Sequence, residues 1–204
     1  MNKIHEFKTS QLNKSILNNY FQSLFPIKKE IVEKITAEHF NFALTRNNIL
    51  INKGIVSTKT YFLEKGYVRS YILNEDNEEV TTNIYSAPCF INDFLSFFNK
   101  QFTKETYQTL TDCTLWETNL ENVEKKLHSI PEFMEFSRYL FFINFDKQHQ
   151  RLIEMASKKA ETRYLTFLQQ QPHVFKHVPL KIIASYLGVT DSTLSRIRKE
   201  ISRV

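Results

Sequence analysis

Glycine is nearly absent from this sequence, with three residues among 204. So few glycines leave no room for a phosphate-cradling loop, and neither G-x-G-x-x-G nor G-x-x-x-x-G-K occurs in the chain. This absence argues against nucleotide hydrolysis and dinucleotide redox chemistry. The sequence also has no recognisable Ser/His/Asp or Cys/His catalytic motif, so we expect that the protein is not an enzyme.

Cysteine is scarce as well. Cys89 and Cys113 are the only two, and their spacing fits neither a C-x-x-C motif nor a zinc or iron–sulfur site. Nothing about them indicates an oxidising compartment. A disulfide between the two cysteines is the alternative to two free thiols. His173 and His177 have a metal-ligand spacing for a helix, but the prolines beside them favour a loop or wing. We therefore expect no metal and no other cofactor.

Long apolar runs are also missing. The N-terminal residues, Met1-Asn-Lys-Ile-His-Glu, lack the apolar region of a signal peptide, and no run approaches the length of a membrane span. We therefore expect a cytoplasmic protein with no membrane partner.

Charge is unevenly distributed along the chain. Residues 1–130 hold 15 Lys+Arg and 15 Asp+Glu, whereas residues 131–204 hold 12 and 7, so the net charge of +5 lies in the C-terminal third. A basic terminal module on a neutral body indicates a polyanionic partner. A merely solvated basic surface would give the same counts.

Two structural patterns precede this basic part. Residues 10–40 have helical spacing broken at Pro26, which predicts two short helices. From Phe42 to about Glu117, short β-branched and aromatic runs alternate with turn signals, and Asn74-Glu-Asp-Asn is the expected tip of a hairpin. Such runs are typical of an antiparallel barrel or jelly roll. They cover residues 49–51, 60–63, 67–73, 80–85 and 114–117.

Helical spacing returns after Asn119, and residues 131–171 contain no internal Pro or Gly. A 4-3-4-3 step from Arg138 yields a seam suited to a partner helix. The apolar surface is broader than this seam, so one flank of the helix would face its own barrel and the other a second subunit. A helix lying wholly against its own domain is the alternative. The seam consists of Phe142, Phe145, His149, Leu152 and Ala156, and the further positions expected to be buried are Phe136, Leu140, Phe141 and Ile143.

Residues 180–201 have the pattern of a helix-turn-helix. Ala184 is small where two helices would approach most closely, and Gly188 lies where the chain must turn with positive φ. Thr190 can cap the second helix, and Asp191 is favourable in its first turn. An ordinary helical hairpin is the alternative. The apolar contacts expected to lock the pair come from Ile183, Leu187, Val189, Leu194 and Ile197.

The second helix of this pattern offers a polar face to a DNA groove. Arg196 can bond two acceptors on a guanine edge, whereas Thr193 and Lys199 suit phosphates. Arg198 lies to one side of this face. For each exposed Arg or Lys, the alternative to a DNA contact is a side chain that is simply solvated. The DNA-binding candidates are Ser192, Thr193, Ser195, Arg196 and Lys199.

With strands, a long helix and a helix-turn-helix in this order, residues 40–204 resemble the Crp/Fnr family of bacterial regulators. Gly66-Tyr-Val-Arg-Ser-Tyr and Asn77-Glu-Glu-Val look like the family's barrel hairpin. Cys89-Phe-Ile-Asn-Asp-Phe looks like its effector-binding segment, and Ile182-Ile-Ala-Ser-Tyr-Leu-Gly-Val-Thr like its DNA reader.

The resemblance implies an α+β fold. An N-terminal antiparallel β-barrel of the cyclic-nucleotide-binding type, a jelly roll, would be followed by a long dimerisation helix and a C-terminal winged helix-turn-helix. The corresponding parts are a sensor domain at 1–130, a dimerisation helix at 131–157 and a DNA-binding domain at 158–204. The chain ends three residues after Ile201, so we expect an abbreviated wing that rests on residues 174–178.

The resemblance also implies roles for single residues on the DNA side. Ser192 and Arg196 would contact bases, and Thr193 would contact a phosphate. Asp191 stands where several family members carry a base-reading Arg, so we expect a different preference for DNA sequence.

The effector segment departs from the family pattern. Ala87-Pro88 and Asn92 replace the glycines that hold a cyclic-nucleotide phosphate, and Lys104-Glu105 falls near the family's Arg-Ser pair. Glu105 beside a phosphate would be repulsive, which argues against cyclic AMP. Asp93 keeps the acid that can meet a ribose hydroxyl. The effector-binding candidates are Asn92, Asp93, Lys104 and Glu105.

Together these patterns predict a sequence-specific transcription regulator that acts as a homodimer on palindromic double-stranded DNA. Its effector is an unidentified small molecule, or none is needed, and RNA polymerase is a further partner that the resemblance implies for an activator. The alternative is a small-molecule-binding sensor module whose role in DNA binding is secondary or decayed.

Overall fold

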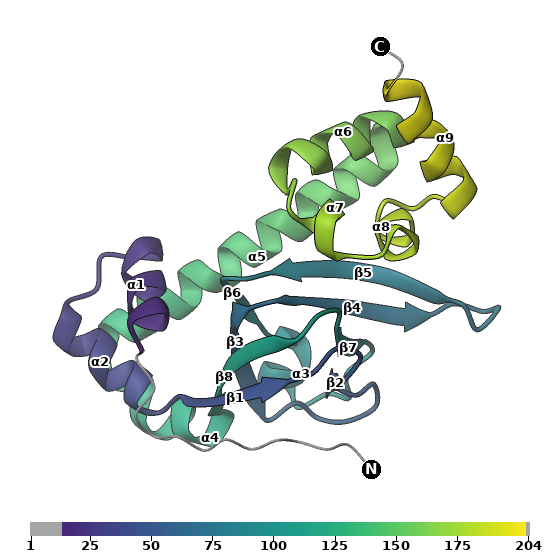
Figure 1. The fold of residues 1–204 in the computed structure, drawn as a ribbon. Helices are drawn as coiled ribbons and strands as arrows, with labels where there is room; N and C mark the ends of the chain where they lie inside the picture. The colour runs from purple at the N-terminus through teal and green to yellow at the C-terminus, as the bar shows by residue number, and fades with distance from the viewer. Residues whose placement is uncertain (1–13, 203–204) are drawn as a thin grey trace.

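Antiparallel strands build the N-terminal part of the protein, whose computed structural model describes residues 14–202 (Figure 1). They form two four-stranded sheets that face each other. Sheet A has the strand order β1-β8-β3-β6, and sheet B has the order β2-β7-β4-β5. The strands are β1 (Phe40–Leu44), β2 (Ile49–Ile51), β3 (Lys59–Lys65), β4 (Tyr67–Leu73), β5 (Glu79–Ser86), β6 (Cys89–Ile91), β7 (Thr106–Thr109) and β8 (Cys113–Asn119).

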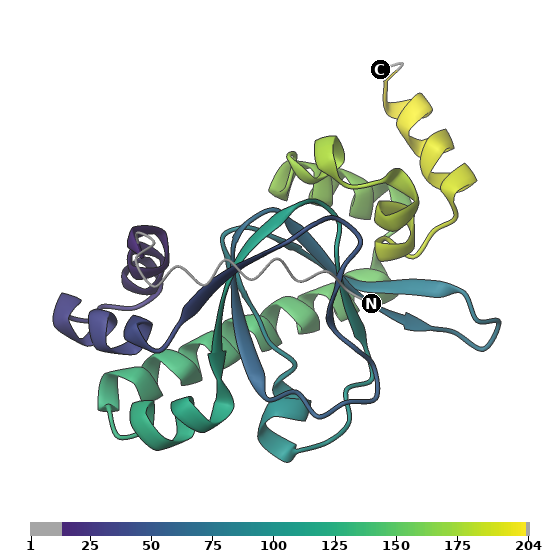
Figure 2. The same cartoon turned by 60° about the horizontal axis from the view of Figure 1, so that its bottom comes forward.

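Helices precede, interrupt and follow the sheets. The long helix α5 runs past the sheets from the end of the molecule that holds α1 and α2 to the C-terminal helices, as Figure 2 shows from a second side. The helices are α1 (Ser15–Leu24), α2 (Lys29–Ala37), α3 (Phe94–Asn99), α4 (Leu120–Asn122), the π-helical turn η1 (Val123–Leu127), α5 (Pro131–Ser157), α6 (Ala160–Gln170), α7 (Val174–His177), α8 (Leu180–Tyr186) and α9 (Asp191–Ile201).

Three apolar clusters hold these elements together. The first fills the space between the two sheets, where Leu63, Ile91 and Leu115 are fully buried. Tyr61 and Tyr107 share this interior, and burial raises the pKa of both phenols, so they stay protonated. Side chains, two of them tyrosines, therefore occupy the region between the sheets.

The second cluster lies on the outer face of sheet A. Phe62, Phe90 and Trp116 pack there against α1, α2, η1 and α5, and the Phe21 ring of α1 lies 4.5 Å from the Phe136 ring of α5. Both faces of sheet A are covered, so residues 61–63 of β3 are buried consecutively rather than alternately. The third cluster joins the C-terminal helices to sheet B.

Most of the predicted elements are present. The two short helices around Pro26, the five predicted strand runs and the hairpin tip between β4 and β5 are confirmed. The sequence did not predict β1, β6, β7 or α3. The three strands have at most five residues each and pair with strands distant in sequence, which a local pattern does not reveal.

Two expectations were wrong. Residues 174–178 do not form part of a wing, because 174–177 are the helix α7, and no strand follows Asn119 within the described residues. Val174 is fully buried and His177 stacks on Tyr67 of β4 at 5.4 Å, which ties this segment to the barrel. Phe141 was expected to be buried but is 48% exposed, because its ring meets only the edge of the contact, edge-on to Phe94 of α3 at 5.4 Å; Ile143 is half-buried against the second cluster.

The helices of residues 14–202 include none that is long and apolar enough to cross a membrane.

His39 is a buried titratable group in the second cluster. Its Nδ1 lies 3.1 Å from the carbonyl oxygen of Ile35, and its ring meets the Phe21 ring edge-on. Burial lowers the pKa of His39 to about 4; the contact with Ile35 opposes this shift, and the nearby Lys14 charge adds to it. The imidazole is therefore neutral at neutral pH.

This burial predicts a pH-dependent stability. Below an unfolded-state pKa of 6.5 the unfolded chain gains a proton at His39 that the folded chain does not accept until about pH 4. The free energy of unfolding should therefore fall by about 2 kcal/mol between pH 6.5 and 5. Urea titrations across this range measure the slope. His39→Gln should remove it, whereas the exposed control His173→Gln should keep it; equal slopes for both variants would contradict the assignment.

Two glycines predict a graded loss of stability. Gly54 (φ +85°) and Gly66 (φ +103°) both have left-handed backbones, but a Cβ on Gly54 meets nothing within 4 Å, whereas one on Gly66 would lie 2.7 Å from the carbonyl oxygen of Asp112. Gly54→Ala should cost about 1 kcal/mol of unfolding free energy, and Gly66→Ala about 2–4 kcal/mol. Urea denaturation measures both. Equal losses would show that the backbone at Gly66 relaxes freely.

Candidate functional site

The helices α8 and α9 cover the segment predicted as a helix-turn-helix and are joined by residues 187–190. Ala184 is 1% exposed, as its small size at the crossing predicts. Thr190 has extended backbone angles, and its hydroxyl accepts a hydrogen bond from the Thr193 N–H at 3.2 Å. Asp191 begins the first turn of α9, so the start of the second helix is capped as the sequence predicts.

Gly188 makes the turn between the two helices, with φ +67°. A Cβ at this position would lie 2.3 Å from the methyl carbon of Met155, so the end of α5 packs directly on the turn. The Val189 N–H donates to the carbonyl oxygen of Ala184 at 3.0 Å and closes the end of α8. The turn is thus shaped by its own hydrogen bonds and by contact with α5.

Two arginines hold the carbonyl end of α8. Arg163 of α6 donates through Nε and Nη2 to the carbonyl oxygen of Leu187 and through Nη1 to that of Lys158, the residue after α5. Arg151 of α5 donates to the carbonyl oxygen of Tyr186 at 2.8 Å and lies over its ring. Guanidinium groups at a helix C-terminus satisfy its free carbonyls and complement its dipole. Neither arginine could be predicted from the sequence, because no local motif marks them.

One face of α9 is buried and the opposite face is open. Leu194 and Ile197 are 1% and 7% exposed, and they pack on α8 and α6. The five DNA-binding candidates lie at positions 192, 193, 195, 196 and 199, which share one side of a helix. Four of them are exposed, and Thr193 is half-buried with its hydroxyl 2.9 Å from that of Thr190. The structure therefore brings these candidates together on a single accessible helix face.

The seam of α5 is also open. Phe142, Phe145 and Leu152 are 63%, 59% and 67% exposed, and His149 and Ala156 are exposed as well. Phe145 and His149 stack at 6.0 Å along the helix. Phe136 and Leu140 on the other flank are buried against sheet A. The two flanks thus differ as the sequence predicts, and dimerisation through the seam stays a prediction.

The helix pair α8–α9 is docked on the outer face of sheet B through α8. The Thr81 N–H of β5 donates to Ser185 Oγ of α8 at 2.8 Å, and the Ser185 hydroxyl donates to the Glu79 carbonyl oxygen at 3.4 Å. Ile84 of β5 belongs to the same apolar cluster as Leu194. The β4–β5 hairpin therefore contacts the first helix of the pair and leaves α9 free.

The four effector-binding candidates do not share one pocket. The Asp93 carboxylate caps α3 by accepting from the Ser96 N–H at 3.0 Å, and Glu105 accepts from the Tyr107 hydroxyl at 3.1 Å. Lys104 lines a shallow surface hollow, and Asn92 lines a different, apolar pocket beside α3. Their role in binding an effector stays a prediction.

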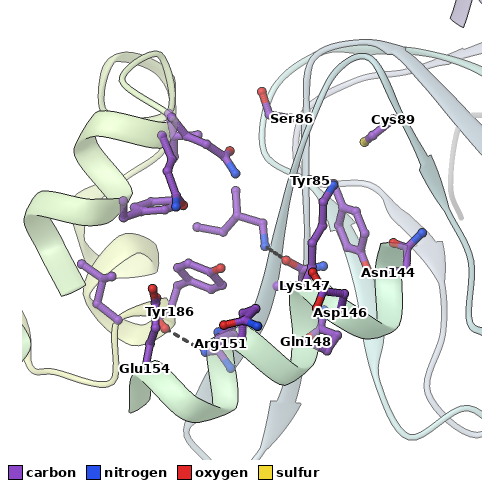
Figure 3. A pocket seen from close by; sticks show the side chains of 18 of the residues that line it. Tyr85, Ser86, Cys89, Asn144, Asp146, Lys147, Gln148, Arg151, Glu154 and Tyr186 are labelled. Atoms are coloured by element: carbon purple, nitrogen blue, oxygen red, sulfur yellow. Dashed lines mark hydrogen bonds between the residues drawn. The ribbon is translucent and has the colours of Figure 1, made fainter. Parts of the chain in front are cut away.

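A cleft of about 590 Å³ separates the barrel from the C-terminal helices. Figure 3 shows Tyr85, Ser86 and Cys89 on its barrel side, Tyr186 across from them, and side chains of α5 between. Its lining carries charges of both signs, including Asp146 and Lys147. Burial raises the pKa of the Cys89 thiol to about 12, so the thiol stays protonated.

Metal-binding groups are not apparent in this site. Within residues 14–202 no three His, Cys, Asp or Glu side chains lie where they could hold one metal ion. Cys89 and Cys113 are both free thiols.

The fold of this protein is similar to that of known proteins. Residues 42–129 match the family model described as the cyclic nucleotide-binding domain. No curated protein matches the sequence. The matched residues run from β1 to the residues just before α5, so the likeness covers the two sheets.

Solved structures share the fold over most of the chain. The c-di-GMP responsive global regulator CLP of Xanthomonas campestris is 14% identical with a TM-score of 0.68, over 86% of this chain and 92% of that one. FixK2 of Bradyrhizobium japonicum is 16% identical with a TM-score of 0.67, over 81% and 85%. A CooA mutant of Carboxydothermus hydrogenoformans is 18% identical with a TM-score of 0.65, over 83% and 78%. The fold is thus a cyclic-nucleotide-binding type of sheet sandwich followed by helices.

Proposed function

We propose that the chain is a sequence-specific DNA-binding transcription regulator that acts as a homodimer on palindromic sites. The observation that carries this proposal is the open face of α9, which presents Ser192, Ser195, Arg196 and Lys199 while the rest of the helix-turn-helix is locked to α5, α6 and β5. A recognition helix needs this arrangement, because base contacts require an accessible helix held in a fixed orientation.

The distribution of charge along the chain agrees with a DNA partner. The excess of basic residues lies in the same C-terminal part of the chain as the open face of α9. Phosphate contacts from this surface would position the duplex, and Arg196 would supply base discrimination. Cyclic AMP is not the proposed effector, because Asn92 replaces a phosphate-binding glycine and Glu105 would oppose the phosphate.

The homodimer follows from α5. Three large apolar side chains of the seam are more than half exposed, which is costly for a lone helix and favourable for a helix pair. Two copies paired along α5 would place their α9 helices on successive major grooves, about 34 Å apart. The proposed regulator binds DNA and carries out no catalysis.

Removal of Arg196 should reduce specificity. Sites recovered from a random DNA pool with the wild-type protein supply the palindrome for this test. Arg196→Ala should lose about 1–3 kcal/mol of discrimination between that palindrome and random DNA, because a bidentate contact to a guanine edge is removed. The ratio of the two dissociation constants at fixed salt measures this loss.

Arg198→Ala is the matched control, since it removes the same charge from the same helix. Only Arg196→Ala should reduce the ratio between the dissociation constants for random DNA and for the palindrome. An unchanged ratio in Arg196→Ala would contradict the role of this side chain.

A charge in the seam should dissociate the dimer. Leu152→Glu buries a carboxylate between the paired helices and should raise the dimer dissociation constant by roughly 100-fold or more. Sedimentation velocity distinguishes the 24.3 kDa monomer from the dimer. Phe102→Glu changes a side chain that is 71% exposed and not part of α5, so it should leave the dimer intact. A monomeric wild-type protein would contradict the proposed seam.

A further inference from the structure

A second pocket lies on the outer face of sheet A, apart from the cleft beside the helix-turn-helix. Its volume is about 670 Å³, within the usual range of small-molecule sites. It is bounded by sheet A, by α3 and by the N-terminal half of α5. Its wall is rich in phenylalanine rings, among them Phe21, Phe90, Phe94, Phe97, Phe133 and Phe136.

Polar side chains form a row along the floor of this pocket. Thr60 of β3 lies directly opposite Thr118 of β8. The pairing of β1 with β8 begins with Phe40 opposite Glu117, so His39, one residue earlier, is level with Thr118. His39, Thr118 and Thr60 thus occupy neighbouring positions across three strands, and all three line the pocket.

The row continues onto β6. Tyr61 of β3 pairs with Ile91, so Thr60 is level with Asn92, which also lines the pocket. Neighbouring positions of adjacent antiparallel strands are about 5 Å apart, which gives four polar side chains in one line across the sheet. Phenylalanines cover this line from α3 and α5.

Two polar atoms of the row have no partner within the described residues. Thr118 is 2% exposed, and its Oγ1 is buried without a hydrogen bond. The Oδ1 atom of Asn92 is buried and unpaired as well. His39 directs Nδ1 at a carbonyl oxygen, so Nδ1 is the donor and Nε2 of the neutral ring is an acceptor. An unpaired buried polar atom is costly, so a ligand that bonds to this row would relieve that cost.

The charges around the pocket exclude an anionic ligand. Within the described residues, the charged side chains that line it are Glu135 and Arg138, which form an ion pair with each other on the exposed side of α5. A buried carboxylate or phosphate would therefore lack a countercharge. A hydroxyl group fits better, because it donates to the acceptors at Asn92 or His39 and accepts from the Thr118 hydroxyl.

We propose that this pocket binds an uncharged alcohol or phenol with an aromatic or aliphatic body, its hydroxyl on the polar row and its body against the phenylalanines. The site is distinct from the space between the sheets, where tyrosines are packed. The proposal does not depend on DNA binding, since occupancy can be measured directly.

Three probes of similar size test the proposal: 2-naphthol, naphthalene and 2-naphthoate. Equilibrium dialysis at pH 7.5 with the full chain should show one bound 2-naphthol per protomer. Its affinity should exceed that of naphthalene about fivefold, the effect of one hydrogen bond, and that of the charged 2-naphthoate at least about tenfold.

Paired variants locate the site. Thr118→Val removes the unpaired hydroxyl at nearly constant volume and should bring 2-naphthol close to the affinity of naphthalene. Thr81→Val is the matched control, because Thr81 Oγ1 is also buried and unpaired but belongs to sheet B. Ser137→Phe fills part of the pocket from α5 and should weaken 2-naphthol and naphthalene alike. Thermal unfolding confirms that each variant is folded.

Several results would overturn the proposal: no binding of 2-naphthol, 2-naphthoate bound as tightly as 2-naphthol, or equal affinities in Thr118→Val and Thr81→Val. Binding that survives in folded Ser137→Phe would place the probe elsewhere and would also overturn it.

Discussion

The contact between two guanidinium groups and the carbonyl end of α8 sets the orientation of the whole C-terminal part. Arg151 and Arg163 bond to the last carbonyls of α8, and Arg163 also bonds to the residue that ends α5. This clamp and the contact of Met155 with Gly188 hold α8 and its turn against α5. Arg151 precedes the seam residue Leu152 on α5, so the clamp ties the position of α8 and α9 directly to the seam. The proposed spacing of two α9 helices on DNA therefore depends on these hydrogen bonds.

Local signals explain which parts of the fold could be predicted from the sequence. The helix pair α8–α9 could be predicted because Gly188, Thr190 and the apolar spacing lie within one short segment, and α5 because it lacks helix breakers. β6 and β7 were missed, since three or four residues carry little pattern and their pairing partners lie far along the chain. The exposure of Phe141 was missed because helical spacing marks an apolar face without showing how much of each side chain the neighbouring elements cover.

The binding sites follow the same division. The DNA-binding candidates come from consecutive turns of one helix, so their spacing alone placed them on a single face. The polar row under the phenylalanines joins His39, Thr60, Asn92 and Thr118 from four parts of the chain, and only the strand register brings them together. The clamp is also non-local, because Arg151 lies 35 residues from its partner Tyr186.

Strand β5 contributes side chains to two apolar clusters, one on each face of sheet B. Tyr85 packs toward the interior between the sheets, whereas the adjacent Ile84 belongs to the cluster of the C-terminal helices. A fragment consisting of residues 158–202 alone would expose its side of that cluster and lose the bond from Thr81 to Ser185. The barrel therefore contributes Ile84 and Leu110 to the hydrophobic core of the C-terminal helices, and separating the two parts would expose apolar surface on both.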